Sequence, residues 1–171
     1  MKSGGSRTFF EAALLASLAW MMVIFIFSAQ PDTASAEVSG SVSYKIVEGV
    51  NLALHLELSQ QQLEERALRI EFPVRKAAHM TEYAILASLI LFVLTFRRNR
   101  GEWHRKRLLR YGLAFGLAVC YAATDEVHQR FVPGRAGQFR DVLIDACGAF
   151  LGLLVVFLFT NCYNRQKRKK R

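Results

Sequence analysis

The chain has 171 residues, of which 52% are hydrophobic, and it carries a formal net charge of +9. Its apolar residues form long runs between basic segments, whereas a basic nucleic-acid-binding protein would spread them in amphipathic patterns. This arrangement excludes a soluble nucleic-acid binder and predicts an all-α, polytopic integral membrane protein. The 3 cysteines are an odd number, lie in apolar runs and lack metal-ligand spacing, so they predict no disulfide framework.

The first predicted span covers residues 9–28, after a cytoplasmic N-terminus of residues 1–8. About 20 apolar residues are needed to cross a bilayer, and this run contains one charge, Glu11, near its start. The alternative is a cleaved signal peptide, because Lys2 and Arg7 form a basic beginning and Ala34–Ala36 resembles a cleavage site. The apolar run is longer than the usual core of a signal peptide, so we expect the span to be retained.

A polar segment of residues 30–74 follows, and we expect it to be helical and extracytoplasmic. Ser59 and Gln62 have the spacing of a capping box, which predicts a short helix that ends near Ile70. Pro73 suits the first turn of the next helix, so a helix boundary is expected there. Before Ser59, helical spacing of apolar residues predicts an amphipathic helix, and one of the two helices should lie on the membrane or over the helix bundle. The apolar residues are Val42, Ile46, Val47, Val50, Leu54 and Leu58.

Three further spans are predicted over residues 76–96, 108–124 and 142–161. The transmembrane domain then covers residues 9–161 with four spans, and a basic tail of residues 162–171 follows. The chain up to Glu11, residues 97–110 and the tail hold 15 of the 23 Lys and Arg residues but only 2 of the 14 acidic residues. Because cytoplasmic loops are rich in Lys and Arg, we expect a multi-pass plasma-membrane protein with both termini in the cytoplasm.

Two predicted spans carry glycines four residues apart, Gly112 with Gly116 in the third and Gly148 with Gly152 in the fourth. A stripe of small residues lets a neighbouring helix approach closely. We therefore expect both stripes to form helix contacts.

Ionisable residues gather at the extracytoplasmic ends of three predicted spans. Helical spacing places His79 and Glu82 on one face of the second span, and Asp141 and Asp145 on one face of the fourth. Ionisable residues in a membrane are costly, so they are functional candidates by default. The predicted ligand-binding set comprises Lys76, His79, Glu82, Tyr83, Asp125, Glu126, His128, Gln129, Arg130, Arg135, Asp141 and Asp145.

Other interpretations of these residues remain open. The charges can serve structure alone, with Asp141 as a helix N-cap and Glu82 paired with Lys76. A metal site is disfavoured because the pattern matches no recognised metal signature and nearby cations compete for the carboxylates, so we predict no metal and no cofactor. If the site is catalytic, the acid-base candidates are His79, Glu82, Asp125, Glu126 and His128.

Four segments of the chain resemble the VanZ-like family of small bacterial membrane proteins, which is named for a teicoplanin-resistance protein. They are Phe27–Gln30 (FSAQ), Arg75–Tyr83 (RKAAHMTEY), Thr124–Arg135 (TDEVHQRFVPGR) and Asp141–Ala149 (DVLIDACGA). The resemblance covers most of residues 10–160. The resemblance implies a multi-helix membrane domain and a link to low-level teicoplanin resistance. It does not imply a particular catalysed reaction.

Three functions are compatible with these observations. The first is a non-enzymatic envelope protein whose outer pocket binds the headgroup of a lipid or cell-wall precursor, or alters how a lipophilic glycopeptide reaches its target. The second is an intramembrane enzyme that acts on a lipid-linked substrate, with His79 or His128 as general base. The third is a structural four-helix module whose charges only pair. The expected partners are the bilayer and a lipid-linked or cell-wall precursor, and nucleic acid is not among them.

Overall fold

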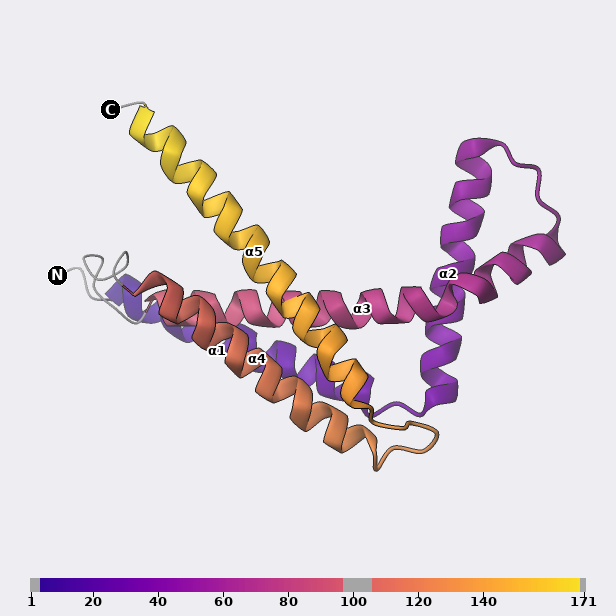
Figure 1. Ribbon diagram of the computed structural model, residues 1–171, viewed down its shortest axis with the longest axis horizontal. Helices are drawn as coiled ribbons and strands as arrows, with labels where there is room; N and C mark the ends of the chain where they lie inside the picture. Colours follow the sequence, from indigo (N-terminus) through magenta and orange to yellow (C-terminus); the bar gives the residue numbers. More distant parts are fainter. Residues whose placement is uncertain (1–3, 97–105, 170–171) are drawn as a thin grey trace.

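The computed structural model describes residues 4–96 and 106–169, and within these ranges the chain forms five α-helices and no strand. The predicted all-α class is therefore confirmed. Residues 97–105, which hold most of the predicted basic loop, lie outside the described residues. The helices are α1 (Gly4–Ser28), α2 (Asp32–Leu54), α3 (Gln60–Phe96), α4 (Arg107–Gln129) and α5 (Phe139–Lys169), as Figure 1 shows.

Among the described residues, three helices are long and apolar enough to cross a membrane: α1, α3 and α5. Their candidate spans are Arg7–Ser28, Gln60–Thr95 and Phe139–Arg168. The helix that carries the predicted third span, α4, does not reach this threshold. Its apolar stretch is bracketed by Arg110 on one side and by Asp125 and Glu126 on the other. A fourth span stays a prediction.

The ends of the helices gather at two opposite ends of the bundle (Figure 1). The start of α1, the end of α3, the start of α4 and the end of α5 lie at one end. The opposite end holds the end of α1, the end of α4, the start of α5 and the helix α2, which runs across α3. The chain consequently returns along the length of the bundle between α3 and α5, and α4 is the segment that makes this return.

The helix boundary expected at Pro73 is wrong, because α3 continues through this residue without interruption. Proline removes one backbone hydrogen bond and usually bends a helix, and α3 changes direction beside α2 in Figure 1. Contacts on both sides of the proline hold the helix together. Arg75 Nη2 lies 2.5 Å from Glu71 Oε1 across the proline, and Leu63 and Ala67 pack on α2.

The helix α2 and the start of α3 follow the predicted local signals. Gln62 Oε1 accepts a 2.9 Å bond from the Ser59 backbone N–H, and Ser59 Oγ accepts a 3.4 Å bond from the Gln62 backbone N–H, so the capping box is confirmed. His55 ends α2 with a left-handed backbone, at φ 50°. The face of α2 that packs on α3 is formed by Ser39, Ser43 and Val47, which are buried at a spacing of four residues.

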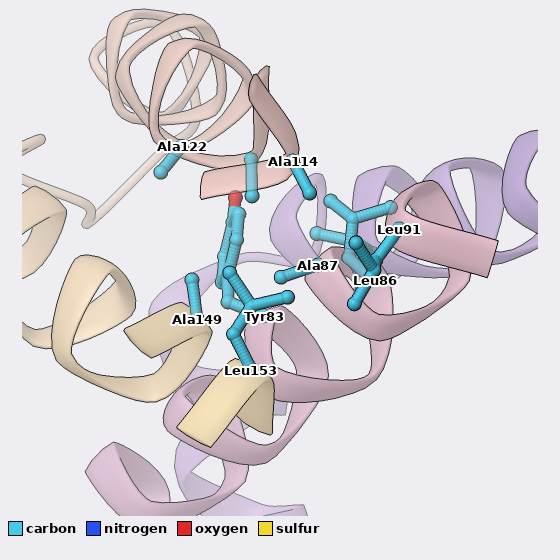
Figure 2. Packing of buried hydrophobic residues seen from close by; sticks show 10 residues of the cluster. Tyr83, Leu86, Ala87, Leu91, Ala114, Ala122, Ala149 and Leu153 are labelled. Atoms are coloured by element: carbon cyan, nitrogen blue, oxygen red, sulfur yellow. The ribbon is translucent and has the colours of Figure 1, made fainter. Parts of the chain in front are cut away.

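The core lies where α3 packs between α4 and α5 (Figure 2). Gly148 and Gly152 of α5 lie directly against the backbone of Met80 and Ala84, and a Cβ atom at either glycine would overlap it. The glycine stripe predicted for the fourth span is therefore confirmed as a helix contact. The corresponding prediction for the third span is wrong, since no other helix of the described residues comes within 4 Å of where a Cβ atom at Gly112 or Gly116 would lie. The buried alanines of α4 face α3 instead: Ala114, Ala118 and Ala122.

Candidate functional site

The candidate site is built around Arg75–Tyr83 of α3, the helix that contacts each of the other four. Helical spacing divides this stretch between two sides. Arg75, His79 and Glu82 line a cavity shared with α1 and α2. Tyr83 enters the core between α4 and α5 on the other side (Figure 2), where Lys76 reaches the start of α5.

The cavity, which we call the α2 pocket, has a volume of about 240 Å³. Apolar side chains from α1, α2 and α3 form much of its wall, and polar groups enter at one end. The combination suits a ligand with both a polar and an apolar part. The polar lining comprises Gln30, Ser35, Ser39, Arg75, His79, Glu82 and Arg135, and the apolar lining comprises Phe27, Val38, Val42, Val74 and Ala78.

His79 and Glu82 form the titratable pair of the α2 pocket. His79 Nδ1 lies 3.6 Å from Glu82 Oε2, slightly beyond hydrogen-bond distance, and both side chains are about one-fifth exposed. The backbone at Glu82 is fixed from α1, because Trp20 Nε1 donates a 2.9 Å bond to Glu82 O. A small rotation of either side chain would bring the imidazole and the carboxylate into hydrogen-bond contact.

Arg135 enters the α2 pocket from the loop between α4 and α5. Its guanidinium donates three bonds to neutral oxygens: Nε to Gln30 O at 3.1 Å, Nη1 to Gln129 Oε1 at 3.4 Å and Nη2 to Phe27 O at 3.4 Å. No carboxylate of the described residues lies within ion-pair distance of it. Since arginine carries five N–H donors, these bonds leave one N–H on each Nη atom, and the charge of Arg135 acts on Glu82 and Asp125 without a direct ion pair.

Arg75 differs from Arg135 because carboxylates already neutralise it. Its Nη1 atom lies 2.6 Å from Asp32 Oδ1, and its Nη2 atom lies 2.5 Å from Glu71 Oε1. The Ser39 hydroxyl also donates to Glu71. These contacts attach the start of α2 to α3 and so hold the wall of the α2 pocket.

A second polar group, which we call the inner carboxylates, lies behind the pocket on α4 and α5. It consists of Asp125, Glu126 and Asp145, each at most 6% exposed. Gln129 Nε2 donates a 3.2 Å bond to Asp125 Oδ2, and the Gln138 backbone N–H donates a 2.8 Å bond to Glu126 Oε2. Asp145 Oδ1 has no hydrogen-bond partner among the described residues.

Burial raises the pKa of both acids at the end of α4. For Asp125, the hydrogen bond from Gln129 opposes this increase in pKa. For Glu126, burial and the charge of Asp141 raise the pKa, while the hydrogen bond from the Gln138 backbone opposes it. The two carboxyl groups are thus held in an environment that disfavours their charged forms.

The remaining predicted site residues lie in three places. Lys76 Nζ is 2.6 Å from Asp141 Oδ1, so this pair connects α3 to α5 beside the inner carboxylates. The His128 ring stacks near Phe25 of α1, with centroids 4.6 Å apart, and does not line the α2 pocket. Arg130 is exposed, and its Nε donates to Gly137 O at 3.3 Å. Of the twelve predicted residues, only His79, Glu82 and Arg135 line the α2 pocket.

Sequence reasoning missed the contribution of α2 to the pocket. Ser35 and Ser39, which line it, recur with Ser43 every four residues along α2. A serine stripe beside an apolar stripe indicates a helix with a polar contact face, whereas the apolar residues alone predict only that the helix is amphipathic. Among the described residues, no group of three or more His, Cys, Asp or Glu side chains is arranged to hold a metal ion.

Comparison with known proteins gives one match. The model of the family described as VanZ/LLP1 matches residues 13–160, which is most of the chain. No curated protein and no solved structure matches the chain. The matched range contains the α2 pocket and the inner carboxylates.

Proposed function

The chain belongs to the VanZ/LLP1 family, and we propose that its α2 pocket binds the phosphate-bearing headgroup of a membrane lipid or lipid-linked cell-wall precursor. The observation that carries this proposal is Arg135. Among the described residues no carboxylate lies within ion-pair distance of its guanidinium, and three of its five N–H groups donate to neutral oxygens. The side chain is half-buried in the pocket, beside His79 and Glu82. Charge-assisted bonds from arginine suit phosphate and carboxylate ligands.

The surroundings of Arg135 support an anionic ligand with an apolar tail. The charge of Arg135 also acts on His79, which lines the same end of the pocket. The apolar side chains Val38 and Val42 face the cavity from α2. A headgroup at Arg135 would therefore leave its hydrocarbon part against an apolar wall.

The proposed topology is a bacterial plasma-membrane protein with four spans and both termini in the cytoplasm. Three helices qualify as spans by length and composition, and α4 runs back along the bundle between α3 and α5 (Figure 1). The distribution of Lys and Arg then places the α2 pocket on the extracytoplasmic side. In intact cells, an impermeant thiol reagent should label a cysteine at position 64 and not one at position 103. The reverse labelling would move the pocket to the cytoplasm.

In this position the protein would act on the outer leaflet of the bilayer. A pocket that holds lipid or precursor headgroups there would change the access of a lipophilic glycopeptide such as teicoplanin to its target. Low-level resistance to such compounds would follow from binding alone, without a change in the target.

An enzyme is the second candidate, and the observation that favours it is the His79–Glu82 pair within the same cavity. A carboxylate beside an imidazole can orient it as a general base, and a guanidinium can stabilise a developing anion. The substrate would again be a lipid-linked phosphate or ester in the outer leaflet.

The headgroup proposal is tested by removing the charge of Arg135. Purified full-length protein in nanodiscs is exposed to polyprenyl phosphate or to phosphatidylglycerol, and retained lipid is quantified by mass spectrometry. We expect Arg135→Gln to lose about tenfold in affinity, on the order of 1.4 kcal/mol, and Arg135→Lys to keep part of it. Preference for one lipid distinguishes a precursor ligand from a bulk lipid.

The matched control is Arg140→Gln, which removes the same charge from an exposed position outside the α2 pocket. This variant should retain both lipids as the wild type does. Equal retention by Arg135→Gln and the wild type would contradict a headgroup site at Arg135.

A further inference from the structure

One side of α2 is covered by neither α3 nor any other described helix. It carries Val38, Val42, Ile46 and Val50, which follow one another every four residues and are each 44–52% exposed. We call these four residues the α2 stripe. They lie beside the face of Ser39, Ser43 and Val47 that packs on α3, so the helix has two faces with different contacts.

Two acidic side chains of α2 lie away from the stripe, whereas Lys45, three residues after Val42, lies at its edge. At about 100° per residue, Glu37 and Glu48 share one face of the helix, and both are exposed. Helix α2 therefore has an apolar side and a charged side in addition to its contact with α3. A large apolar side next to a charged side is the pattern of a helix that lies in a membrane surface.

The position of α2 relative to the spans decides what can reach the stripe. Only residues 29–31 separate the end of the α1 span at Ser28 from the start of α2 at Asp32. Contacts with two other segments also hold Asp32 close to the end of the α1 span. Its side chain binds Arg75 of α3, and its backbone N–H donates to Pro133 O at 3.4 Å. The helix then runs across α3 at the end of the bundle (Figure 1), and 23 residues extend it by roughly 34 Å.

From this placement we infer that α2 is an interfacial helix whose stripe inserts into the boundary between lipid headgroups and acyl chains. The helices α1 and α3, to which α2 is connected, are long and apolar enough to cross a membrane. Val38 and Val42 belong both to the stripe and to the lining of the α2 pocket. Ile46 and Val50 continue it into a second apolar groove of about 330 Å³ between α2 and α3. Lipid thus closes the side of the pocket that the protein leaves open.

The inference is tested by site-directed spin labelling of the full-length protein in nanodiscs of phosphatidylcholine with phosphatidylglycerol. The three native cysteines, Cys120, Cys147 and Cys162, are first replaced by serine. Labels are then attached to V42C and I46C on the stripe and to E37C and E48C on the charged side. Collision with oxygen, which concentrates in the bilayer, is compared with collision with a water-soluble nickel complex.

The stripe labels should collide several-fold more with oxygen than with nickel, and the labels on the charged side should show the opposite preference. Equal nickel access at all four positions would place α2 in water and overturn the inference. Low access to both reagents at the stripe would show that protein covers it, such as a second copy of the chain, and would overturn it as well. A label at V50C gives an independent measurement if V42C or I46C reduces the thermal stability of the protein.

Discussion

Lys76 Nζ of α3 lies 2.6 Å from Asp141 Oδ1 at the start of α5, and both side chains are largely buried. This contact joins α3, which lines the α2 pocket, to α5, which carries the inner carboxylate Asp145. Asp141 also lies in the first turn of α5, where the helix dipole favours a negative charge. The pair is therefore positioned to fix how α5 begins against α3.

We expect the Lys76–Asp141 pair to show strong energetic coupling. Lys76→Met or Asp141→Asn leaves one partly buried charge without its partner, and each should lower the melting temperature of the purified protein in detergent. The double variant should recover part of the loss, with a coupling energy of about 0.5–3 kcal/mol. Additive effects in this double-mutant cycle would show that the contact adds nothing to stability.

The two glycine stripes give a prediction with an internal control. Gly148→Ala should destabilise the protein, because the added methyl group overlaps the backbone of Met80. Gly112→Ala should be neutral or stabilising by up to about 1 kcal/mol, because the site is open and alanine favours a helix. Thermal unfolding of both variants measures the difference. Similar losses at Gly148 and Gly112 would contradict the observed packing of α5 on α3.

Glu126 should make stability depend on pH in a defined direction. In the unfolded chain a glutamate ionises near pH 4.3, whereas burial and the charge of Asp141 raise the pKa of Glu126 in the folded protein. The folded state therefore binds the proton more tightly. The stability that this proton contributes is complete below the unfolded pKa and is lost as pH rises through the folded pKa.

Glu126→Gln removes this titration and can still accept the hydrogen bond from the Gln138 backbone N–H. The variant should gain melting temperature relative to the wild type as pH rises from about 4 toward 8. Melting curves across this range provide the measurement. Parallel curves for the two proteins would show that Glu126 has the same affinity for protons in both states.

His79 separates ligand binding from catalysis. If His79 only holds a ligand, His79→Gln can replace part of a hydrogen bond, and the loss should be about 0.5–1.5 kcal/mol. If His79 is a general base, an amide cannot replace it, and the rate should fall about 100- to 10,000-fold. We expect binding, so teicoplanin protection at matched membrane levels should persist in part in His79→Gln and be weaker in His79→Ala. Equal loss in both variants, with lipid retention intact, would favour the enzyme.

The sequence predicts local features of the fold well because they depend on neighbours along the chain. The capping box of Ser59 and Gln62 depends on residues three positions apart, and the amphipathic nature of α2 depends on a repeat of four. The glycines of α5 were predicted to permit close packing, which α3 confirms. The same pattern at Gly112 failed, because a stripe of small residues does not specify which side of a helix meets a partner.

The composition of the pocket was less predictable, because it depends on how helices cross. Helical spacing placed His79 and Glu82 on one face, but not the α2 serines opposite them. His128 lies in the same segment as Asp125 and yet turns toward Phe25 of α1. Pro73 predicts a helix boundary, but the contact of Arg75 with Glu71 and the packing of α3 on α2 explain why the helix continues.

The contact between Lys76 and Asp141 also has a consequence for the order in which the protein is made. The two residues are 65 positions apart, and a ribosome releases the chain from its N-terminus onward. Helix α3 thus reaches the membrane with Lys76 before the residue that neutralises it has been synthesised. Helix α5 supplies this residue, so Lys76 gains its partner only when α5 packs on α3.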